Sequence, residues 1–230
     1  MIKIAPSILN CDFTNLKELI RLIEEAGADM LHMDVMDGHF VPNISFGPGL
    51  VSSINRITKL PLDVHLMVEN PEKFISVFAT AGARVITVPL EACINLGEEI
   101  GAIKKEGLRV GVALNPQTPV DSLLDYLKQI DMALLMTVEP GYGGQKFIGS
   151  VLPKIAQVRK YISKNGLDVD IEVDGGIDLE TGQSAMDSGA NILVAGEYIF
   201  GSRDPRKAIR DLRKLSDLSL KRTGWEEVCQ

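Results

Sequence analysis

Short runs of apolar and β-branched residues recur along the whole chain, and each run is too short to form a helix. Gly, Pro or Asp bounds each of them, and several are apolar at nearly every position, which is typical of strands buried on both faces. These runs lie at residues 2–9, 30–35, 62–68, 85–90, 110–114, 133–138, 171–173 and 192–195. The pattern therefore predicts eight buried strands.

Amphipathic, charged stretches separate these runs and show the spacing of helices. In residues 13–26, for example, apolar residues recur at helical intervals at Leu16, Leu19, Ile20 and Ile23. Five further stretches have the same character, at residues 71–81, 95–106, 120–129, 150–165 and 179–188. We therefore expect helices between most of the strands.

A glycine marks the joint between a predicted helix and the next strand. Glycine takes the left-handed conformation that ends many helices at little cost. The glycines at these joints are Gly27, Gly82, Gly107, Gly166 and Gly189. The repeating unit of strand, helix, glycine and strand predicts an α/β fold, a single (β/α)8 TIM barrel over residues 1–230. An open doubly wound sheet is the alternative.

No change of composition and no Pro/Ser-rich linker indicates a second domain. The polar stretch at residues 215–230 predicts a final helix followed by a short tail, which begins at about residue 217. The N-terminus has only a short apolar run before Pro6, so we expect no signal peptide.

Composition narrows the possible partners. Lys and Arg number 24 against 31 Asp and Glu, a net charge of −7, which argues against nucleic acid or an anionic membrane as the main partner. No apolar stretch is long enough to span a membrane. The three cysteines, Cys11, Cys93 and Cys229, are widely spaced and form no CxxC pair. These features predict a cytoplasmic protein without a disulfide framework.

Two histidines and two aspartates fall in or directly after predicted strands. His32 and Asp34 alternate and so share one face of their strand, His65 lies in the next strand, and Asp174 follows residues 171–173. A lone buried histidine is usually a core residue with a hydrogen-bond partner. Two imidazoles with two carboxylates at corresponding depths instead favour one divalent metal ion, such as Zn, Fe(II), Mn or Co.

Glycines gather after three of the later strands, where the loops of many barrels bind phosphate. Each glycine alone indicates only a turn, but together they predict a phosphate site, because they let the backbone amides approach an anion. They are Gly141, Gly143, Gly144, Gly175, Gly176 and Gly196. The pattern is neither GxGxxG nor a Walker loop, so it gives no support to dinucleotide or NTP binding.

Three methionines lie near the same rim of the predicted barrel, at Met36, Met67 and Met136. Methionine is usually a core residue. The alternative here is an apolar lining that keeps water away from a reactive intermediate.

With these residues in hand, the sequence resembles the ribulose-phosphate 3-epimerases over nearly its whole length. The matching motifs are APSIL at 5–9, HMDVMDGHFVPN at 32–43, DVHLMV at 63–68, TVEPGYGGQ at 137–145 and VDGGI at 173–177. The resemblance implies a (β/α)8 barrel that interconverts D-ribulose 5-phosphate and D-xylulose 5-phosphate in the pentose phosphate pathway.

The resemblance also implies roles for individual residues. His32, Asp34, His65 and Asp174 would bind the metal ion, and Asp34 and Asp174 would also be the catalytic acid and base. Further residues would contact the phosphorylated ketose or line the reacting centre, with backbone amides near the glycines holding the phosphate. This substrate-binding set is Ser7, Met36, His65, Met67, Met136, Gly141, Gly143, Gly144, Gly175, Gly176, Gly196 and Glu197.

Two positions depart from the pattern that the family usually shows. Pro89 stands in place of a histidine after the fourth strand, and Glu197 stands in place of a serine after the eighth. Both changes affect expected substrate contacts, so a 3-epimerase of another ketose phosphate, such as allulose 6-phosphate, is an alternative. A decarboxylase or aldolase on a similar barrel and a non-catalytic sugar-phosphate sensor are further alternatives. A homo-oligomer is possible.

Overall fold

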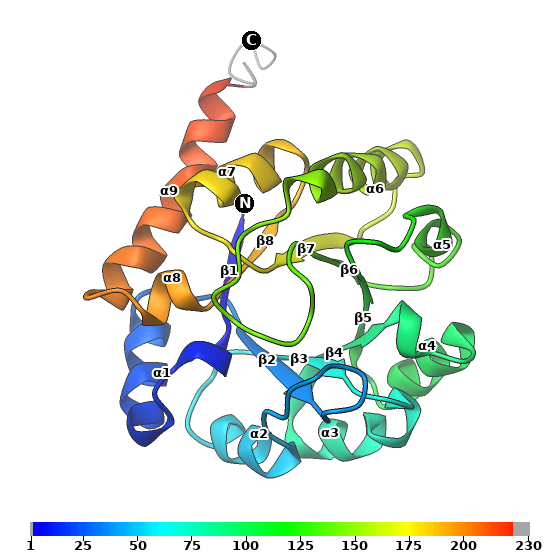
Figure 1. Cartoon of the computed structure of the whole chain (residues 1–230), viewed down its shortest axis with the longest axis horizontal. Helices are drawn as coiled ribbons and strands as arrows, with labels where there is room; N and C mark the ends of the chain where they lie inside the picture. Colours follow the sequence, from blue (N-terminus) through cyan, green and yellow to red (C-terminus); the bar gives the residue numbers. More distant parts are fainter. Residues whose placement is uncertain (1, 223–230) are drawn as a thin grey trace.

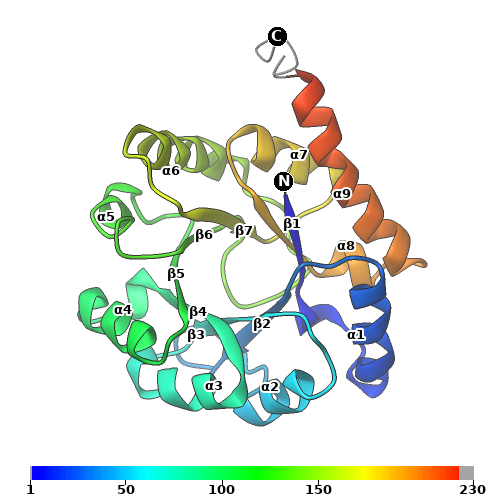
Figure 2. The same cartoon turned by 180° about the vertical axis from the view of Figure 1, so that it is seen from behind.

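The computed structural model describes residues 2–222, with side chains described as far as residue 215. These residues form a ring of eight strands surrounded by helices (Figures 1 and 2). The strands are β1 (Lys3–Pro6), β2 (Leu31–Met36), β3 (Leu62–Met67), β4 (Ala83–Pro89), β5 (Arg109–Leu114), β6 (Met132–Met136), β7 (Asp170–Asp174) and β8 (Ile192–Ala195).

The strands are all parallel and follow the order β1-β8-β7-β6-β5-β4-β3-β2. A single bridge between Ser7 and His32 joins β1 to β2 and brings the ring nearly to closure. The predicted single-domain (β/α)8 barrel is therefore confirmed, and the open doubly wound alternative is wrong.

Helices lie outside the ring, in the connections between the strands (Figure 1). They are α1 (Leu16–Glu25), α2 (Pro48–Asn55), α3 (Ile75–Ala81), α4 (Leu96–Lys105), α5 (Asp121–Leu124), α6 (Leu152–Lys164), α7 (Leu179–Asp187), α8 (Glu197–Phe200) and α9 (Pro205–Arg222). Short 3-10 turns precede several of them, at η1 (Ile8–Asn10), η2 (Phe13–Asn15), η3 (Pro71–Lys73), η4 (Leu90–Ala92) and η5 (Gly149–Val151).

Some element boundaries differ from the prediction. The helix predicted at 120–129 is only four residues long, because the chain after Leu124 turns through i to i+3 hydrogen bonds such as Tyr126 N–H to Leu123 O. Helices α2 and α8 were not predicted, and α9 begins at Pro205, before the final helix predicted within residues 215–230. The tail was expected to begin at about residue 217, but α9 continues to Arg222. The rest of the expected tail, residues 223–230, lies outside the described part of the chain.

The interior of the barrel is apolar on some strands and polar on others. Six apolar side chains at positions that alternate with the helix-facing ones form a cluster of their own: Ala5, Met30, Val85, Met132, Ile192 and Val194. On β2, β3 and β7 the inward positions instead carry His32, Asp34, Asp63, His65 and Glu172, all buried. Burying such groups is costly without partners, yet His65 Nδ1, Asp63 Oδ1 and both carboxyl oxygens of Glu172 make no hydrogen bond.

The glycines predicted at the helix–strand joints all have positive φ angles, at Gly27, Gly82, Gly107, Gly166 and Gly189. At Gly189 space is also limiting, since a Cβ there would lie 2.6 Å from Cβ of Arg159 on α6. At Gly27 nothing lies within 4 Å of an added Cβ. The two joints therefore share a backbone requirement but differ in packing.

We expect Gly189→Ala to destabilise the chain more than Gly27→Ala does. The left-handed backbone costs an alanine about 1 kcal/mol at either position, and the clash with Arg159 adds about 1–3 kcal/mol at residue 189 alone. Urea unfolding of both variants measures the difference. Equal losses of unfolding free energy would contradict the packing argument.

Candidate active site

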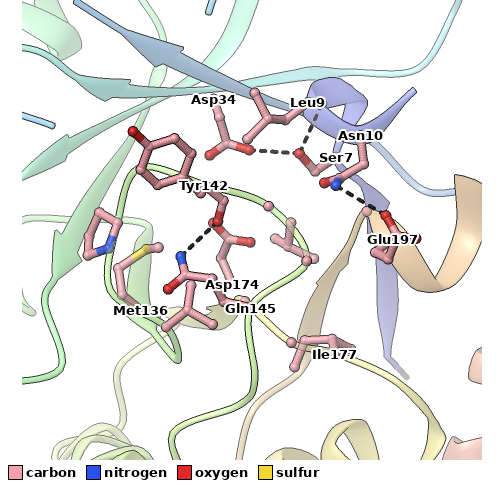
Figure 3. Close-up of a pocket in the computed structure, with 18 of the residues that line it drawn as sticks. Ser7, Leu9, Asn10, Asp34, Met136, Tyr142, Gln145, Asp174, Ile177 and Glu197 are labelled. Carbon is pink, nitrogen blue, oxygen red and sulfur yellow. Dashed lines mark hydrogen bonds between the residues drawn. The ribbon is translucent and has the colours of Figure 1, made fainter. Parts of the chain in front are cut away.

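A cavity of about 530 Å³ opens at the carboxyl ends of the strands (Figure 3). This volume lies within the usual range for small-molecule sites. Most residues predicted for the site line it: Ser7, Asp34, Met36, Met67, Met136, Gly141, Gly143, Gly144, Asp174, Gly175, Gly176, Gly196 and Glu197. Residues distant in the sequence therefore meet in one place, as expected for the loop-bearing end of such a barrel.

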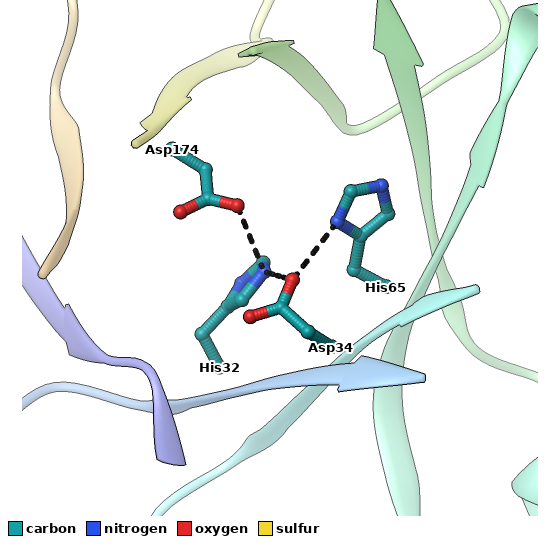
Figure 4. A group of neighbouring side chains, drawn as sticks. All are labelled: His32, Asp34, His65 and Asp174. Atoms are coloured by element: carbon teal, nitrogen blue, oxygen red, sulfur yellow. Dashed lines mark hydrogen bonds and ion pairs between the residues drawn. The ribbon is translucent and has the colours of Figure 1, made fainter. Parts of the chain in front are cut away.

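His32 and His65 do not line the cavity but lie deeper in the barrel, where both are almost completely buried. Asp34 pairs with His65 in the register of β2 and β3, so the two side chains lie next to each other. His65 Nδ1 is 3.4 Å from Asp34 Oδ1, and His32 Nε2 is 3.2 Å from the same oxygen. His32 Nε2 is also 3.9 Å from Asp174 Oδ2 (Figure 4).

These four side chains can hold a metal ion. One donor atom from each of His32, Asp34, His65 and Asp174 lies within 4.8 Å of all the others. His65 Nδ1 is buried and makes no hydrogen bond, so its lone pair is available to a ligand. A set of two nitrogens and two oxygens suits divalent ions such as zinc, iron(II), manganese or cobalt. The donor set therefore fits a divalent cation.

The charges in this cluster stabilise one another. Burial lowers the pKa of His32, but the neighbouring Asp34 and Asp63 carboxylates outweigh it and raise that pKa well above its usual value. Burial likewise raises the pKa of Asp34, but His32 and His65 outweigh it and hold that pKa well below its usual value. Asp34 is therefore ionised at neutral pH, even though water hardly reaches it.

Asp174 is affected in the opposite direction. Burial and the nearby negative charge of Asp34 raise the pKa of Asp174 to about 7. Two carboxyl groups at the same cavity thus differ in their readiness to give up a proton. Such a difference is typical of an acid and base pair.

Ser7, directly after β1, contacts Asp34. Its hydroxyl donates a hydrogen bond to Asp34 Oδ2 over 2.7 Å and accepts one from the backbone N–H of Leu9 over 3.3 Å. The bond from Leu9 caps the short turn η1, which directs Ser7 into the cavity. Both oxygens of Asp34 are therefore hydrogen-bonded, one by Ser7 and the other by His32.

The three predicted methionines are buried and still line the cavity. Met36 and Met67 pack together with Val41, while Met136 packs with Val138 and other residues of β5 and β6. They are thus both core residues and an apolar wall beside the carboxylates. Such a wall lowers the local polarity and strengthens electrostatic interactions in the cavity.

Asn10 was missed by the sequence analysis, although it lies between two of the predicted phosphate loops. A Cβ at Gly143 would lie 2.4 Å from the Asn10 amide nitrogen, and one at Gly196 would lie 2.3 Å from its amide oxygen. Only glycine leaves room for this side chain on both loops. Asn10 Nδ2 also donates to Glu197 Oε2 over 3.5 Å, so the Glu197 carboxylate is directed toward Asn10.

The loop after β6 lies over the barrel (Figure 1) and is attached to the loop after β2. Tyr142 Oη donates to Pro42 O over 2.7 Å, and Asn43 Nδ2 donates to Gly141 O over 2.8 Å. Gln145 Nε2 bonds to two carbonyl oxygens within its own loop. These contacts hold the glycines of this loop at the rim.

Several other residues at the site were missed by the sequence analysis. Tyr142 and Gln145 line the cavity and lie within the motif at 137–145, from which only the glycines were predicted to bind the substrate. Lys146, which directly follows this motif, lines the cavity too. Asp63 and Glu172 are fully buried beneath the cluster. Their signal was present, since each precedes a predicted metal ligand by two positions and so shares its inward face.

Pro89 ends β4 and is not among the residues that line the cavity. Glu91, two positions later, accepts hydrogen bonds from Asn115 N–H and from the Thr118 hydroxyl, and so holds the loop after β5. Of the two positions where the sequence departs from the usual pattern, only Glu197 lines the cavity.

Comparison with solved structures agrees on the fold. A 3-hexulose-6-phosphate synthase from Salmonella typhimurium matches with a TM-score of 0.72 at 17% identity, covering 93% of this chain and 98% of that one. KGPDC from Streptococcus mutans matches with a TM-score of 0.71 at 14% identity, covering 94% of this chain and 98% of that one. At these identities the likeness concerns the barrel alone.

Sequence relatives are much more similar. The ribulose-phosphate 3-epimerase of Bacillus subtilis is 51% identical over 214 residues, covering 93% of this chain and 99% of the relative. The enzyme of the same name from Methanocaldococcus jannaschii is 46% identical, covering 93% and 91%. The model of the ribulose-phosphate 3 epimerase family matches residues 3–200. The chain therefore belongs to the ribulose-phosphate 3-epimerase family.

Proposed function

We propose that this chain interconverts D-ribulose 5-phosphate and D-xylulose 5-phosphate by moving a proton at C3. The observation that carries this proposal is the pair of carboxyl groups at one cavity. The environment lowers the pKa of Asp34 and raises that of Asp174 to about 7. At neutral pH, one group can therefore accept a proton while the other can donate one.

Inversion at C3 requires a proton to leave one face of the carbon and another to arrive on the opposite face. The C2 carbonyl makes the C3 proton acidic, and its removal leaves an enediolate. Asp34 and Asp174 extend from β2 and β7, which are not neighbours in the barrel, and both reach the cavity. Ionised Asp34 would accept the proton on one side, and protonated Asp174 would deliver one on the other. The roles exchange in the reverse reaction.

His32, Asp34, His65 and Asp174 would hold a divalent cation, namely Zn, Fe(II), Mn or Co. When bound, such an ion supplies Lewis-acid stabilisation of the negative charge that develops when C3 loses its proton. The hydroxyl of Ser7, which holds Asp34 Oδ2, orients this base and lies close enough to the cavity to contact the sugar. Met36, Met67 and Met136 would exclude water from the reacting carbon.

The glycine loops would hold the phosphate. Among the charged residues that line the cavity, only Lys146 is basic, while Asp34, Asp174, Asp178 and Glu197 are acidic. Backbone amides must therefore supply most of the binding of an anion, as they do where glycines let the chain approach closely. Anchoring the substrate far from C3 orients the reacting carbon between the two carboxyl groups.

Another ketose phosphate, such as allulose 6-phosphate, is the second candidate substrate. Glu197 favours it, because this carboxylate lies in the cavity wall beside the glycines that would hold the phosphate. Like charges repel, so Glu197 changes how a phosphate fits there.

We further propose that the chain is cytoplasmic and acts in the pentose phosphate pathway, and a homo-oligomer remains a prediction. Among the residues that the structure describes, no helix combines the length and the apolar character needed to cross a membrane.

Proton NMR in D2O tests the reaction directly. With metal-supplemented protein and D-ribulose 5-phosphate, we expect the C3 proton signal to disappear as D-xylulose 5-phosphate appears. The same assay with allulose 6-phosphate measures the preference between five and six carbons. Folded, metal-loaded protein that exchanges neither substrate would contradict an epimerase.

Asp34→Asn and Asp174→Asn should each abolish epimerisation. An amide can neither accept nor donate the C3 proton, and loss of a general acid or base costs about 10²–10⁴-fold in rate. With one base left, slow exchange of C3 hydrogen for deuterium without epimerisation is expected for one of the two sugars. Asp125→Asn, at an exposed position on the outside of the barrel, is the matched control. Metal content is measured on every variant, and near-normal epimerisation in either active-site variant would refute the two-base scheme.

The raised pKa of Asp174 predicts a pH-dependent stability in chelator-treated protein. Because folding raises this pKa from 3.8 to about 7, Asp174 contributes stability below pH 4, and that contribution is lost as the pH rises through 7. Relative to wild type, Asp174→Asn should therefore gain on the order of a few kcal/mol in unfolding free energy between pH 4 and pH 8. Urea titrations across that range measure it. Parallel curves for the two proteins would contradict the raised pKa.

A further inference from the structure

A second group of buried polar side chains lies beside Nδ1 of the His32 imidazole, on the side of the imidazole away from the metal-binding cluster. His32 Nδ1 is 2.7 Å from Asp63 Oδ2 and 3.7 Å from Glu172 Oε1. All three side chains have no exposure to solvent. Only the contact with Asp63 is short enough for a hydrogen bond.

The two nitrogens of His32 therefore have different surroundings. Nε2 lies among Asp34 and Asp174, whereas Nδ1 is directed at Asp63. The tautomer of His32 that fits this contact carries its proton on Nδ1 and donates it to Asp63 Oδ2. A neutral ring with its proton on Nδ1 has its free lone pair on Nε2, which is the nitrogen that the metal-binding cluster needs.

The strand register explains why Asp63 occupies this position. His32 on β2 pairs directly with Asp63 on β3, and Asp34 pairs with His65 in the same ladder. Asp63 and His65 are two positions apart on one strand, so both point into the barrel. Strand β3 thus supplies one metal ligand of its own and the hydrogen-bond partner of a ligand on β2.

We propose that Asp63 is a positioning residue, which holds the Nδ1–H of His32 and so directs the Nε2 lone pair into the cluster of His32, Asp34, His65 and Asp174. This inference rests on the metal site of the proposed function. It assigns Asp63 no contact with the substrate. Its effect is on metal affinity, where loss of a carboxylate behind a metal-ligating histidine typically costs about 10- to 100-fold.

Glu172 provides a matched comparison. It is as deeply buried as Asp63 and faces the same nitrogen, but from 3.7 Å. If burial of a carboxyl group beside His32 were enough to support the site, then removing either carboxyl group would weaken metal binding to a similar extent. If the hydrogen bond to Nδ1 supports it, only the change at Asp63 should matter.

The experiment compares Asp63→Asn with Glu172→Gln in the full chain, using Zn²⁺ in competition with a chelator and no substrate. We expect Asp63→Asn to lower the affinity for Zn²⁺ by about 10- to 100-fold. The neutral Asn oxygen is a weaker acceptor for Nδ1–H than a carboxylate, and the amide can also turn and donate to Nδ1, which favours the tautomer with its proton on Nε2. Glu172→Gln should remain close to wild type. Equal losses in both variants, or no loss in Asp63→Asn, would overturn the proposal.

Long-range ¹H–¹⁵N NMR of the zinc-loaded wild type supplies a second readout, which stands even where Asp63→Asn fails to fold. The chain contains three histidines, so few ring signals need to be assigned. We expect His32 to carry its proton on Nδ1. Zinc bound through Nδ1, or a second zinc ion held by His32, Asp63 and Glu172, would overturn the proposal, because either would remove the hydrogen bond to Asp63. Neither readout depends on turnover, so failure of the epimerase assay is distinguishable from failure of this inference.

Discussion

Imidazoles and carboxyl groups that a strand barrel largely shields from water depend on one another for stabilisation. His32 is central to this group, with Asp34 at 3.2 Å from one ring nitrogen and Asp63 at 2.7 Å from the other. Burial alone would favour the neutral form of each group. The pairing instead keeps Asp34 ionised and raises the pKa of His32, while Asp174, which has less positive charge around it, retains its proton more readily. The same arrangement presents nitrogen and oxygen donors at distances that a divalent cation can bridge.

The strands and the loops contribute differently to the site. The proposed metal donors and proton-transfer groups lie on β2, β3 and β7, where ladder hydrogen bonds and a close-packed interior keep their positions well defined. The expected phosphate contacts lie on loops, where Asn10 lies between Gly143 and Gly196 and where Tyr142 attaches the loop after β6 to Pro42. The proposed proton transfer thus depends on residues of the strands and the proposed substrate fit on residues of the loops, where Glu197 also departs from the usual pattern.

The accuracy of the sequence-based prediction followed the length and regularity of each signal. The eight strands were found because apolar runs bounded by breakers are unambiguous when they repeat, and the joint glycines were found because helix ends require positive φ angles. Helix α5 was predicted too long, since its apolar spacing is satisfied equally well by consecutive turns. Helix α2 was missed although Pro48 occupies its first turn, which is a recognised start signal.

The sequence by itself determined which chemical groups are available and on which face of each strand they lie, because alternation along a strand is a local property. His32, Asp34, His65 and Asp174 could therefore be singled out as candidates before any contact was known. Only the tertiary structure decided which groups meet: that Ser7 reaches Asp34, that Asp63 lies behind His32, and that Asn10 lies between two loops. The opposite pKa shifts of Asp34 and Asp174 were decided there too. These outcomes depend on distances between residues far apart in the chain, which are set by strand register and barrel closure rather than by local sequence.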